Sequence, residues 1–414
     1  MTSIDKIKVV HVINSFEFGG AEAMLCNLVL RSDRARFSTS VVSLIDDLTV
    51  ASPLLDAGVP IAVMGFQPGA ADPRALVRLA RYLRSERPGV VQTWMDHSNL
   101  IGGVVARAAT RARVVWGVHH ADHGAGVSKR STRLAVAACA RLSRRVPARV
   151  VCCSEQSRVE YLRRGFAAGN LEVIPNGFDT DVFRPDPAAR FTIRRECNLD
   201  LDAPLVGLAA RFDPVKDHAT FLKAAARLAR WLPEARFLLC GARVDDRNPA
   251  LTALIDEWGL AGRCRLLGPR RDMPRVLAAL DVAASSSLSE AFPLAVGEAM
   301  ACGVPCVGTN VGDTAAIIGP TGRIVPPRDP DALARSWLEL LELDPGARRR
   351  LGLAARERVR SLYDLTAVTG RYEALYSQLA ATTRVHDGAT PRVRVDPRTD
   401  ARPMEEPTPC YPPS

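Results

Sequence analysis

The sequence has no hydrophobic run long enough to cross a membrane. Across its 414 residues, Arg, Asp or Pro interrupts every apolar stretch before the roughly 20 residues that a membrane-spanning helix needs. Its first residues, MTSIDKIKVVHVIN, also lack the basic segment, apolar segment and small-residue cleavage site of an export signal, and are typical of a buried first strand. We therefore expect a cytoplasmic protein.

The cysteines lack the paired spacing of zinc ribbons and redox motifs. Ten of them are scattered from Cys26 to Cys410, and neither Cys152-Cys153 nor Cys302-x-x-x-Cys306 fits either pattern. In a reducing compartment thiols are kept reduced, so a disulfide framework is not expected. Free cysteines are usually buried as small apolar side chains. We expect buried, reduced thiols.

Aromatic residues are also scarce, at 6%, beside 47% apolar and 24% charged residues. This composition is typical of a soluble α/β protein and excludes fibrous, disordered and disulfide-stapled classes. A chain of 414 residues exceeds what a single hydrophobic core usually organises. Two domains are therefore expected.

Acidic residues are too few in the first half to balance its basic ones. Residues 1–175 hold 23 Lys and Arg against 14 Asp and Glu, so that nearly all of the net charge of +10 lies there. A one-sided excess of this kind indicates an anionic partner, which could be a membrane surface, a phosphorylated substrate or nucleic acid. The basic stretches have no interleaved aromatics and no reader motif, so nucleic acid is not expected.

Both halves of the chain alternate apolar β-rich runs with amphipathic helical stretches. A segment rich in Pro, Asn, Gly and Asp, IPNGFDTDVFRPDPAAR, separates them and is typical of a linker with turns. The alternation predicts two doubly wound α/β domains that face each other across a cleft, with ligands beyond the carboxyl ends of the strands. The predicted boundaries are 1–178 and 179–363, then a helix over 364–380 that packs back on the first domain and a disordered Pro-rich tail over 381–414.

The stretch SEAFPLAVGEAM carries two carboxylates around a helix start. Pro293 is favoured at the first helical position, which would leave the amide groups of Leu294 and its neighbour free to meet a phosphate. Glu290 precedes that helix and Glu298 lies inside it, so both can line one pocket and accept hydrogen bonds from sugar and ribose hydroxyls. The alternative is that Glu290 complements the helix dipole and Glu298 is a solvated helix residue.

The stretch LAARFDPVKDH predicts a strand followed by a short loop with two cations. Arg211 and Lys216 at the carboxyl end of a parallel strand suit a diphosphate, because both stay charged and the guanidinium binds two oxygens. A surface ion pair with Asp213 or Asp217 is the alternative interpretation.

Two features of the first half are weaker. Gly19-Gly20 lies between a predicted strand and helix, where glycines let a loop approach a ligand, although a tight turn explains it equally well. His119, His120 and His123 follow another strand without the carboxylate or cysteine partners of a zinc site. We expect His119 to contact substrate in the cleft, and His120 and His123 to be structural.

The segment SKRSTRLAVAACARLSRRVPAR places several arginines along one helical side. No acidic residue occurs from Gly124 to Cys153, which suits a helix lying on an anionic membrane surface, and the alternative is a solvated basic face. The arginines are Arg130, Arg133, Arg141, Arg144 and Arg145.

Taken together, these motifs resemble the family-4 retaining glycosyltransferases of the two-Rossmann (GT-B) architecture, of the bacterial capsule, exopolysaccharide or lipopolysaccharide type. The resemblance covers residues 8 to about 380. It implies that Glu290 contacts the transferred sugar, Glu298 the nucleotide ribose, and Arg211 with Lys216 the diphosphate. The predicted catalytic set is His119, Arg211, Lys216 and Glu290. The predicted donor-binding set is Gly19, Gly20, Arg211, Lys216, Arg270, Glu290, Phe292, Pro293, Leu294 and Glu298.

The resemblance also implies the activity. It implies transfer of a sugar, with retention, from a UDP- or GDP-linked donor to a saccharide or lipid-linked saccharide acceptor. The product would belong to cell-surface polysaccharide or glycolipid synthesis. The enzyme would be peripheral to the membrane and would use no metal or other cofactor. An epimerase or phosphorylase of the same fold, or an inactive nucleotide-sugar-binding peripheral membrane protein, are the competing interpretations.

Overall fold

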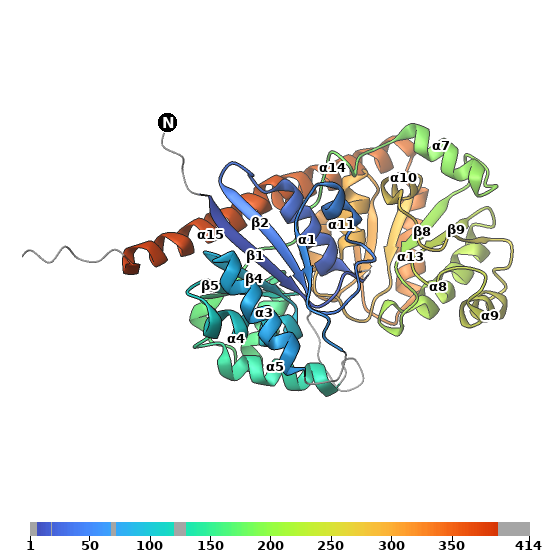
Figure 1. The fold of residues 1–414 in the computed structure, drawn as a ribbon. Coiled ribbons are helices and arrows are strands. Elements are labelled where there is room, and N and C mark those ends of the chain that lie inside the picture. The colour runs from blue at the N-terminus through green and yellow to red at the C-terminus, as the bar shows by residue number, and fades with distance from the viewer. Residues whose placement is uncertain (1–5, 18, 68–71, 120–129, 388–414) are drawn as a thin grey trace, which may run out of the picture.

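The computed structural model describes residues 6–17, 19–67, 72–119 and 130–387, which form two lobes (Figure 1). Each lobe contains one parallel β-sheet covered by helices on both faces, because each sheet packs against one hydrophobic core on either side. This arrangement confirms the predicted pair of doubly wound domains.

The first sheet has seven strands in the order β3-β2-β1-β4-β5-β6-β7. Its strands are β1 (Ile7–Ile13), β2 (Phe37–Ser43), β3 (Ile61–Val63), β4 (Val90–Trp94), β5 (Arg113–Val118), β6 (Arg149–Cys152) and β7 (Leu171–Val173). The helices between them are α1 (Gly20–Arg31), α2 (Ser52–Asp56), α3 (Pro73–Glu86), α4 (Asp96–Ala109), α5 (Arg130–Leu142) and α6 (Glu155–Arg163).

The second sheet has six strands in the order β10-β9-β8-β11-β12-β13. Its strands are β8 (Leu205–Ala209), β9 (Arg236–Cys240), β10 (Cys264–Leu266), β11 (Val282–Ser285), β12 (Cys306–Thr309) and β13 (Arg323–Val325). Its helices are α7 (Pro187–Glu196), α8 (His218–Trp231), α9 (Pro249–Glu257), α10 (Met273–Ala278), α11 (Leu294–Ala301), α12 (Thr314–Ile318), α13 (Pro330–Glu342) and α14 (Pro345–Tyr363).

The direction in which strands are added reverses once in each sheet. The reversal falls between β1 and β4 in the first sheet and between β8 and β11 in the second. The loops that leave the carboxyl ends of two such neighbouring strands diverge, and the crevice between them is the usual ligand site of a doubly wound sheet. Gly19-Gly20 follows β1, whereas Arg211 follows β8 and Glu290 follows β11, so the topology alone brings these predicted residues to the two crevices.

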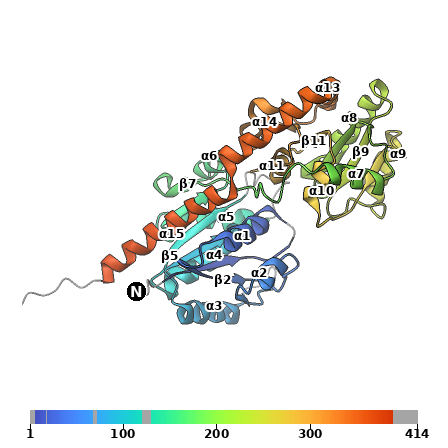
Figure 2. The ribbon, with the colours of Figure 1, turned by 90° about the horizontal axis from the view of Figure 1, so that it is seen from above.

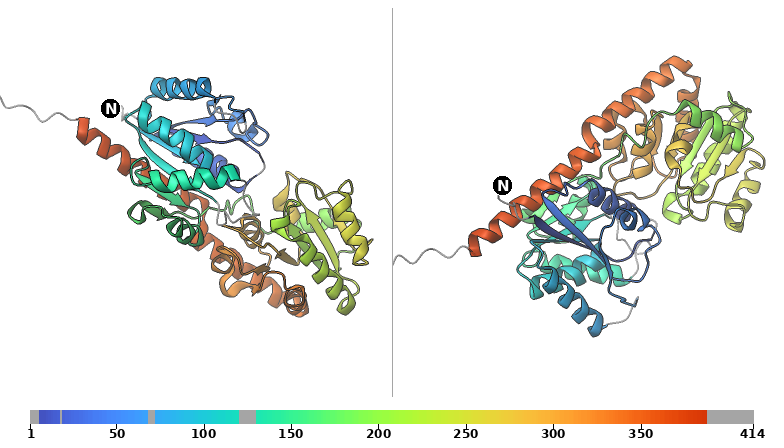
Figure 3. Two further views of the ribbon diagram at one scale, coloured as in Figure 1. Left: turned by 90° about the horizontal axis from the view of Figure 1, so that it is seen from below. Right: turned by 45° about the horizontal axis from the view of Figure 1, so that its top comes forward.

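The last helix, α15 (Leu365–Asp387), crosses back to the first domain, as predicted (Figures 1 and 2). Leu365, Tyr372 and Leu379 belong to the same core as β1 and β4, and the Tyr376 hydroxyl lies 3.3 Å from Oε1 of Gln92. The helix continues to Asp387, so seven residues of the predicted tail are helical, while residues 388–414 lie outside the described part. Seen from below, α14 and α15 run along both lobes (Figure 3).

The chain passes between the domains at two places that pair with each other. The Phe178 amide donates to the Tyr363 carbonyl at 2.8 Å, and the Leu365 amide donates to the Phe178 carbonyl at 3.0 Å. The Phe178 ring stacks on Phe292 of the second domain at a centroid distance of 5.7 Å. The two crossings are therefore one connection and not two independent linkers.

The predicted linker contains the start of a helix. Asp186 accepts a hydrogen bond from the Ala189 amide at 2.9 Å and Pro187 is the first residue of α7. An Asp cap followed by Pro is a helix-start signal as well as a turn signal, which is why the composition of this segment was misleading.

The described cysteines are all free thiols, and all but the partly exposed Cys264 are buried. This agrees with the expectation of reduced, buried cysteines, and Cys410 lies outside the described part. Within the described residues, no helix combines the length and the apolar character needed to cross a bilayer.

A buried ion pair attaches α7 to the second sheet. Arg194 is fully buried, donates to Asp281 at 2.7 Å and also donates to the carbonyl of Ala203 at 2.6 Å. Arg190 binds the other oxygen of Asp281 at 2.9 Å but is 37% exposed.

We predict that Arg194→Ala destabilises the second domain by about 3–5 kcal/mol, because it leaves the buried Asp281 carboxylate and several carbonyls short of a donor. Arg190→Ala is the matched control, with an expected loss of about 1 kcal/mol or less. Urea unfolding followed by tryptophan fluorescence measures both. Equal losses for the two variants would contradict the assignment.

Candidate active site

Residues from β8 and β11 meet at the switch point of the second sheet. Lys216, in the short turn after β8, places its Nζ 2.5 Å from Oε1 of Glu290. Ser287, which follows β11, donates to the same oxygen at 2.7 Å, and Ser286 donates to the Lys216 carbonyl at 2.8 Å. The Lys216 and Glu290 side chains are only 19% and 13% exposed, so this pair is held in a partly desolvated position.

Arg211 lies at the edge of the same site. Its Nε is 3.2 Å from Oδ2 of Asp213, and the arginine side chain is half exposed. The surface ion pair considered from the sequence is therefore present for Arg211, but Lys216 pairs with Glu290 instead of Asp217, which caps α8 through the Thr220 amide. An exposed pair of this kind is weak, so Arg211 remains available to an anionic ligand.

The helix α11 begins one residue later than predicted. Pro293 is the residue before the first turn, and Leu294 is the first helical residue. No side chain caps this end of the helix, so its first amide groups face the site without a side-chain acceptor. Phe292 is buried against Phe178 and Tyr363, with ring centroids at 5.7 and 5.5 Å, so its side chain supports the connection between the domains.

Glu298 lies at a small cavity between the two domains. The cavity, about 20 Å³ in volume, is also lined by Met24 and Asn27 of α1 and by Phe178. Burial raises the pKa of Glu298 to about 7. Glu298 is therefore not a fully solvated helix residue, and it lies beside residues of the opposite domain.

The glycine loop of the first domain contacts the start of α11. A Cβ added to Gly20 would lie 3.2 Å from Cδ1 of Leu294, and one added to Gly19 would lie 2.1 Å from a carboxylate oxygen of Glu22. Glu22 thus folds back on the first turn of α1, and burial, with Glu17 contributing, raises its pKa to about 7 although Arg211 opposes the shift. The structure brings Gly19 and Gly20 to the predicted donor side of the cleft.

His119 lies at the carboxyl end of β5 in the first domain. Its ring stacks on Trp94 with a centroid distance of 5.0 Å and an interplanar angle of 22°. Trp94 donates in turn to Nδ1 of His11 at 3.1 Å, and burial lowers the pKa of His11 to about 3, which keeps it a neutral acceptor. His120 and His123 lie outside the described residues. Within the described part, no three metal-binding side chains gather at one point.

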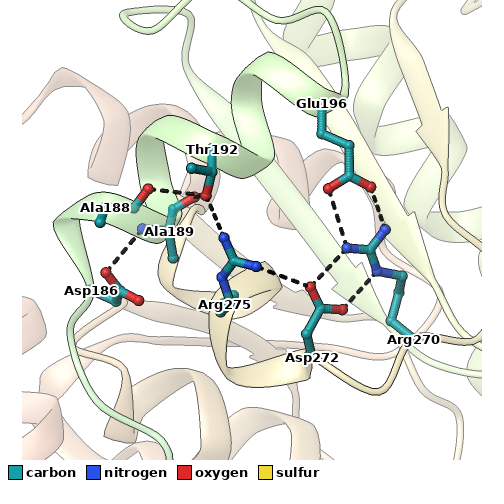
Figure 4. Close-up of polar contacts among 8 residues, drawn as sticks. All are labelled: Asp186, Ala188, Ala189, Thr192, Glu196, Arg270, Asp272 and Arg275. Carbon is teal, nitrogen blue, oxygen red and sulfur yellow. Dashed lines mark hydrogen bonds and ion pairs between the residues drawn. The ribbon is translucent and has the colours of Figure 1, made fainter.

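Arg270 is part of an ion-pair network between the β10–α10 loop and α7 (Figure 4). It donates to Asp272 at 2.7 and 2.8 Å and is paired with Glu196 of α7, and these bonds raise its pKa. Arg275 extends the network to Thr192 at 2.7 Å. The Arg270 side chain is therefore engaged within the protein, and the structure does not bring it to Lys216 and Glu290.

The basic segment forms α5, which ends at Leu142. Arg130 and Arg141 are exposed, as are Arg144 and Arg145 in the turn after the helix. Arg133 is half-buried, so it does not belong to the exposed basic side of the helix that was predicted. Leu134, the next residue of α5, is 72% exposed.

Some residues of the site were not predicted. Ser287 orients Glu290, Glu22 covers Gly19, and Trp94 supports His119. Met95, which follows Trp94, has a φ of 73°, a region that favours glycine. The run of serines after a buried strand was a usable sequence signal for Ser287. Nothing in the sequence indicates the positive φ of Met95.

Two family models match the chain. Residues 18–182 match Glycosyltransferase Family 4, and residues 203–343 match Glycosyl transferases group 1. Each match covers one of the two domains described above.

Curated relatives and a solved structure are also similar to this chain. A D-inositol 3-phosphate glycosyltransferase of Mycobacterium sp. (strain KMS) is 35% identical over 187 residues, which are 44% of this chain and 41% of the relative. The enzyme of that name from Corynebacterium efficiens is 32% identical over 234 residues, 54% of each chain. This chain thus spans about half the length of the curated relatives that it matches. Anabaena Alr3699/HepE, solved with UDP and glucose, superposes with a TM-score of 0.79 at 22% identity, over 90% of this chain and 100% of that one.

The raised pKa of Glu298 predicts a pH-dependent stability. When the pKa of a carboxyl group rises from 4.5 to about 7 on folding, the free energy of unfolding of the protein falls as the pH rises through that interval. The reason is that the ionised carboxylate is disfavoured in the folded state. We predict that Glu298→Gln stabilises the protein at pH 8 by about 1–3 kcal/mol and has little effect at pH 5.

Urea unfolding at the two pH values measures this difference, and exposed Glu257→Gln is the control, with no pH-dependent gain expected. A Glu298→Gln variant that is equally destabilised at both pH values would refute the prediction.

Proposed function

Because the chain belongs to the family-4 glycosyltransferases, we propose that it transfers a sugar, with retention, from a nucleotide-sugar donor to a lipid-linked saccharide at a membrane surface. The observation that carries this proposal is the Lys216–Glu290 pair, which is held by Ser287 at the switch point of the second sheet, beside Arg211. Cations and an oriented carboxylate are what a sugar diphosphate needs at a strand end.

The cations and amides would hold the leaving nucleoside diphosphate. Lys216 and Arg211 supply positive charge, and the first turn of α11 supplies amide donors that no side chain caps. These groups stabilise the charge that develops on the diphosphate as the glycosidic bond breaks, without requiring a metal ion for that purpose. Glu298 accepts hydrogen bonds from the ribose hydroxyls.

Glu290 would orient the sugar. Its Oε1 already accepts bonds from Lys216 and Ser287, so the carboxylate has a fixed position but is partly neutralised and weak as a nucleophile. The acceptor hydroxyl attacks from the same face as the leaving diphosphate, whose oxygen takes the proton. His119 contacts the sugar from the other domain. A covalent glycosyl-Glu290 adduct found by mass spectrometry would refute this mechanism.

The membrane surface would meet α5. Four exposed arginines together with exposed Leu134 combine positive charge with an apolar side chain, which suits an anionic bilayer. The protein would then act peripherally, on the cytoplasmic face. A second candidate acceptor is a soluble inositol phosphate, because the curated relatives are named for it.

Donor binding is the first prediction. Among UDP- and GDP-linked sugars, at least one raises the melting temperature of the protein, because a ligand bound only to the folded state stabilises it. Lys216→Ala weakens binding of that donor about 10–100-fold, which corresponds to loss of one charge-assisted hydrogen bond. Lys8→Ala, on the surface of the first domain, is the control with unchanged binding. A panel with no shift would contradict the donor assignment.

Product analysis separates transfer from its competitors. Incubation with the stabilising donor and either a lipid-linked saccharide or inositol 3-phosphate yields a new glycoside, and nuclear magnetic resonance shows that its anomeric configuration equals that of the donor. An epimerised nucleotide sugar, or tight donor binding without any product, would favour the epimerase or the inactive binding protein.

Membrane binding is a separate prediction. Reversing charge at Arg141, Arg144 and Arg145 lowers the affinity for vesicles containing about a third phosphatidylglycerol, measured by sedimentation, by at least roughly 100-fold, since losing three basic residues near the surface alone costs about 3 kcal/mol. The same charge change at exposed Arg81 and Arg84 of α3 and at exposed Arg87, which follows that helix, is the control. If wild-type protein ignores anionic vesicles, α5 is a solvated basic face.

A further inference from the structure

Asp313 bonds to the opposite domain instead of to its own helix. It precedes α12, but no side-chain bond caps that helix. Its two carboxylate oxygens accept hydrogen bonds from the amides of Glu155 at 3.0 Å and Gln156 at 3.1 Å, the first residues of α6 in the first domain.

Most other aspartates at helix starts in this protein behave differently, and the exception, Asp272 before α10, is paired with Arg270 instead. Asp72, Asp186, Asp329 and Asp344 each accept bonds from amides of the helix that they precede, which is the usual role of a capping aspartate. Asp313 therefore leaves its own helix uncapped while it satisfies two amides across the cleft. The two bonds do not stabilise α12, and they link the second domain to the first.

The turn that carries Asp313 packs directly on Glu290. The Asp313 amide donates to the Ala291 carbonyl at 3.2 Å. Gly312 has a φ of 54°, and a Cβ placed there would lie 2.1 Å from the Glu290 carbonyl oxygen. There is no space between this turn and the backbone of Glu290. A displacement of Asp313 would therefore move the carboxylate that pairs with Lys216.

The Asp313 contact lies in an interface that is not fully buried. Asp313 is only partly buried, and burial raises its pKa even though the two amide bonds of α6 oppose the shift. Domains that meet in an interface of this kind commonly move relative to each other, so the contact can form and open with that movement.

We propose that Asp313 is a positioning residue that couples closure of the two domains to the placement of Glu290. When α6 meets Asp313, the 311–313 turn is fixed against the Glu290 backbone, and the carboxylate is held at Lys216 with His119 of the first domain opposite. When the domains separate, that restraint is lost. The inference rests on the proposed glycosyl transfer and adds a residue that acts through the backbone of Glu290.

The test compares Asp313→Ala and Asp313→Asn with Ser154→Ala. Ser154 also caps α6, accepting from the Ser157 amide at 2.9 Å, but it lies in the same domain as that helix. The control removes a cap from the same helix end without touching the second domain. Nucleotide binding is measured by calorimetry with UDP, or with GDP in its place if a GDP-sugar gives the largest thermal shift. Turnover is measured by hydrolysis of that nucleotide sugar, and domain separation by small-angle X-ray scattering.

Asp313→Ala is expected to lower turnover at least about tenfold while the Kd for the nucleotide changes less than about twofold, because a small misplacement of a reacting group costs rate and not ground-state binding. Its radius of gyration rises. Asp313→Asn, which keeps one acceptor oxygen, is intermediate, and Ser154→Ala matches wild type in all three measurements.

Two results would overturn the proposal: equal turnover loss in Asp313→Ala and Ser154→Ala, or an unchanged radius of gyration in Asp313→Ala. Failure of the proposed function is recognised separately, since wild-type protein would then bind neither UDP nor GDP, and the scattering comparison would still decide whether Asp313 holds the domains together.

Discussion

The paired crossing at Phe178 and Leu365 is the constraint on which the rest of the molecule depends. Nothing in either doubly wound sheet alone fixes the orientation in which the carboxyl edges of the two sheets face each other. The backbone bonds between Phe178 and the 363–365 segment, and the packing of Phe178, Phe292 and Tyr363, join the two domains at one place close to the start of α11. With that point fixed, the glycine loop meets Leu294 and α6 meets Asp313.

Much of the fold was predictable from the sequence. Strand and helix periods, with turn signals between them, are local properties, and their alternation allows few sheet topologies. Gly19-Gly20, His119, Arg211 and Lys216 were assigned to strand ends and Glu290 to the loop before a helix, and parallel strands bring their carboxyl ends to one edge. The crossing of the last helix was likewise predictable from its amphipathic pattern at the end of two otherwise complete domains.

The features that could not be predicted are contacts between side chains that lie far apart in the sequence. Lys216 pairs with Glu290 and not with the neighbouring Asp217, because strand order places β8 beside β11. Arg270 has the right charge for a diphosphate, but Glu196 and Asp272 engage its guanidinium. Phe292 is adjacent in sequence to the donor helix and yet packs in the connection between the domains. A cross-domain bond such as that of Asp313 leaves no trace in either local segment.

The position of α15 also affects how the chain reaches its native state. Residues at the very end of the described chain complete the core under β1 and β4, so during synthesis the first sheet emerges with one face only partly covered, by α1 and α2. The whole second domain must be translated before that face closes, a delay on the order of ten seconds or more at ordinary elongation rates. The order of translation thus makes the first domain the last to be finished, and during that interval its apolar surface is a target for chaperones and for aggregation.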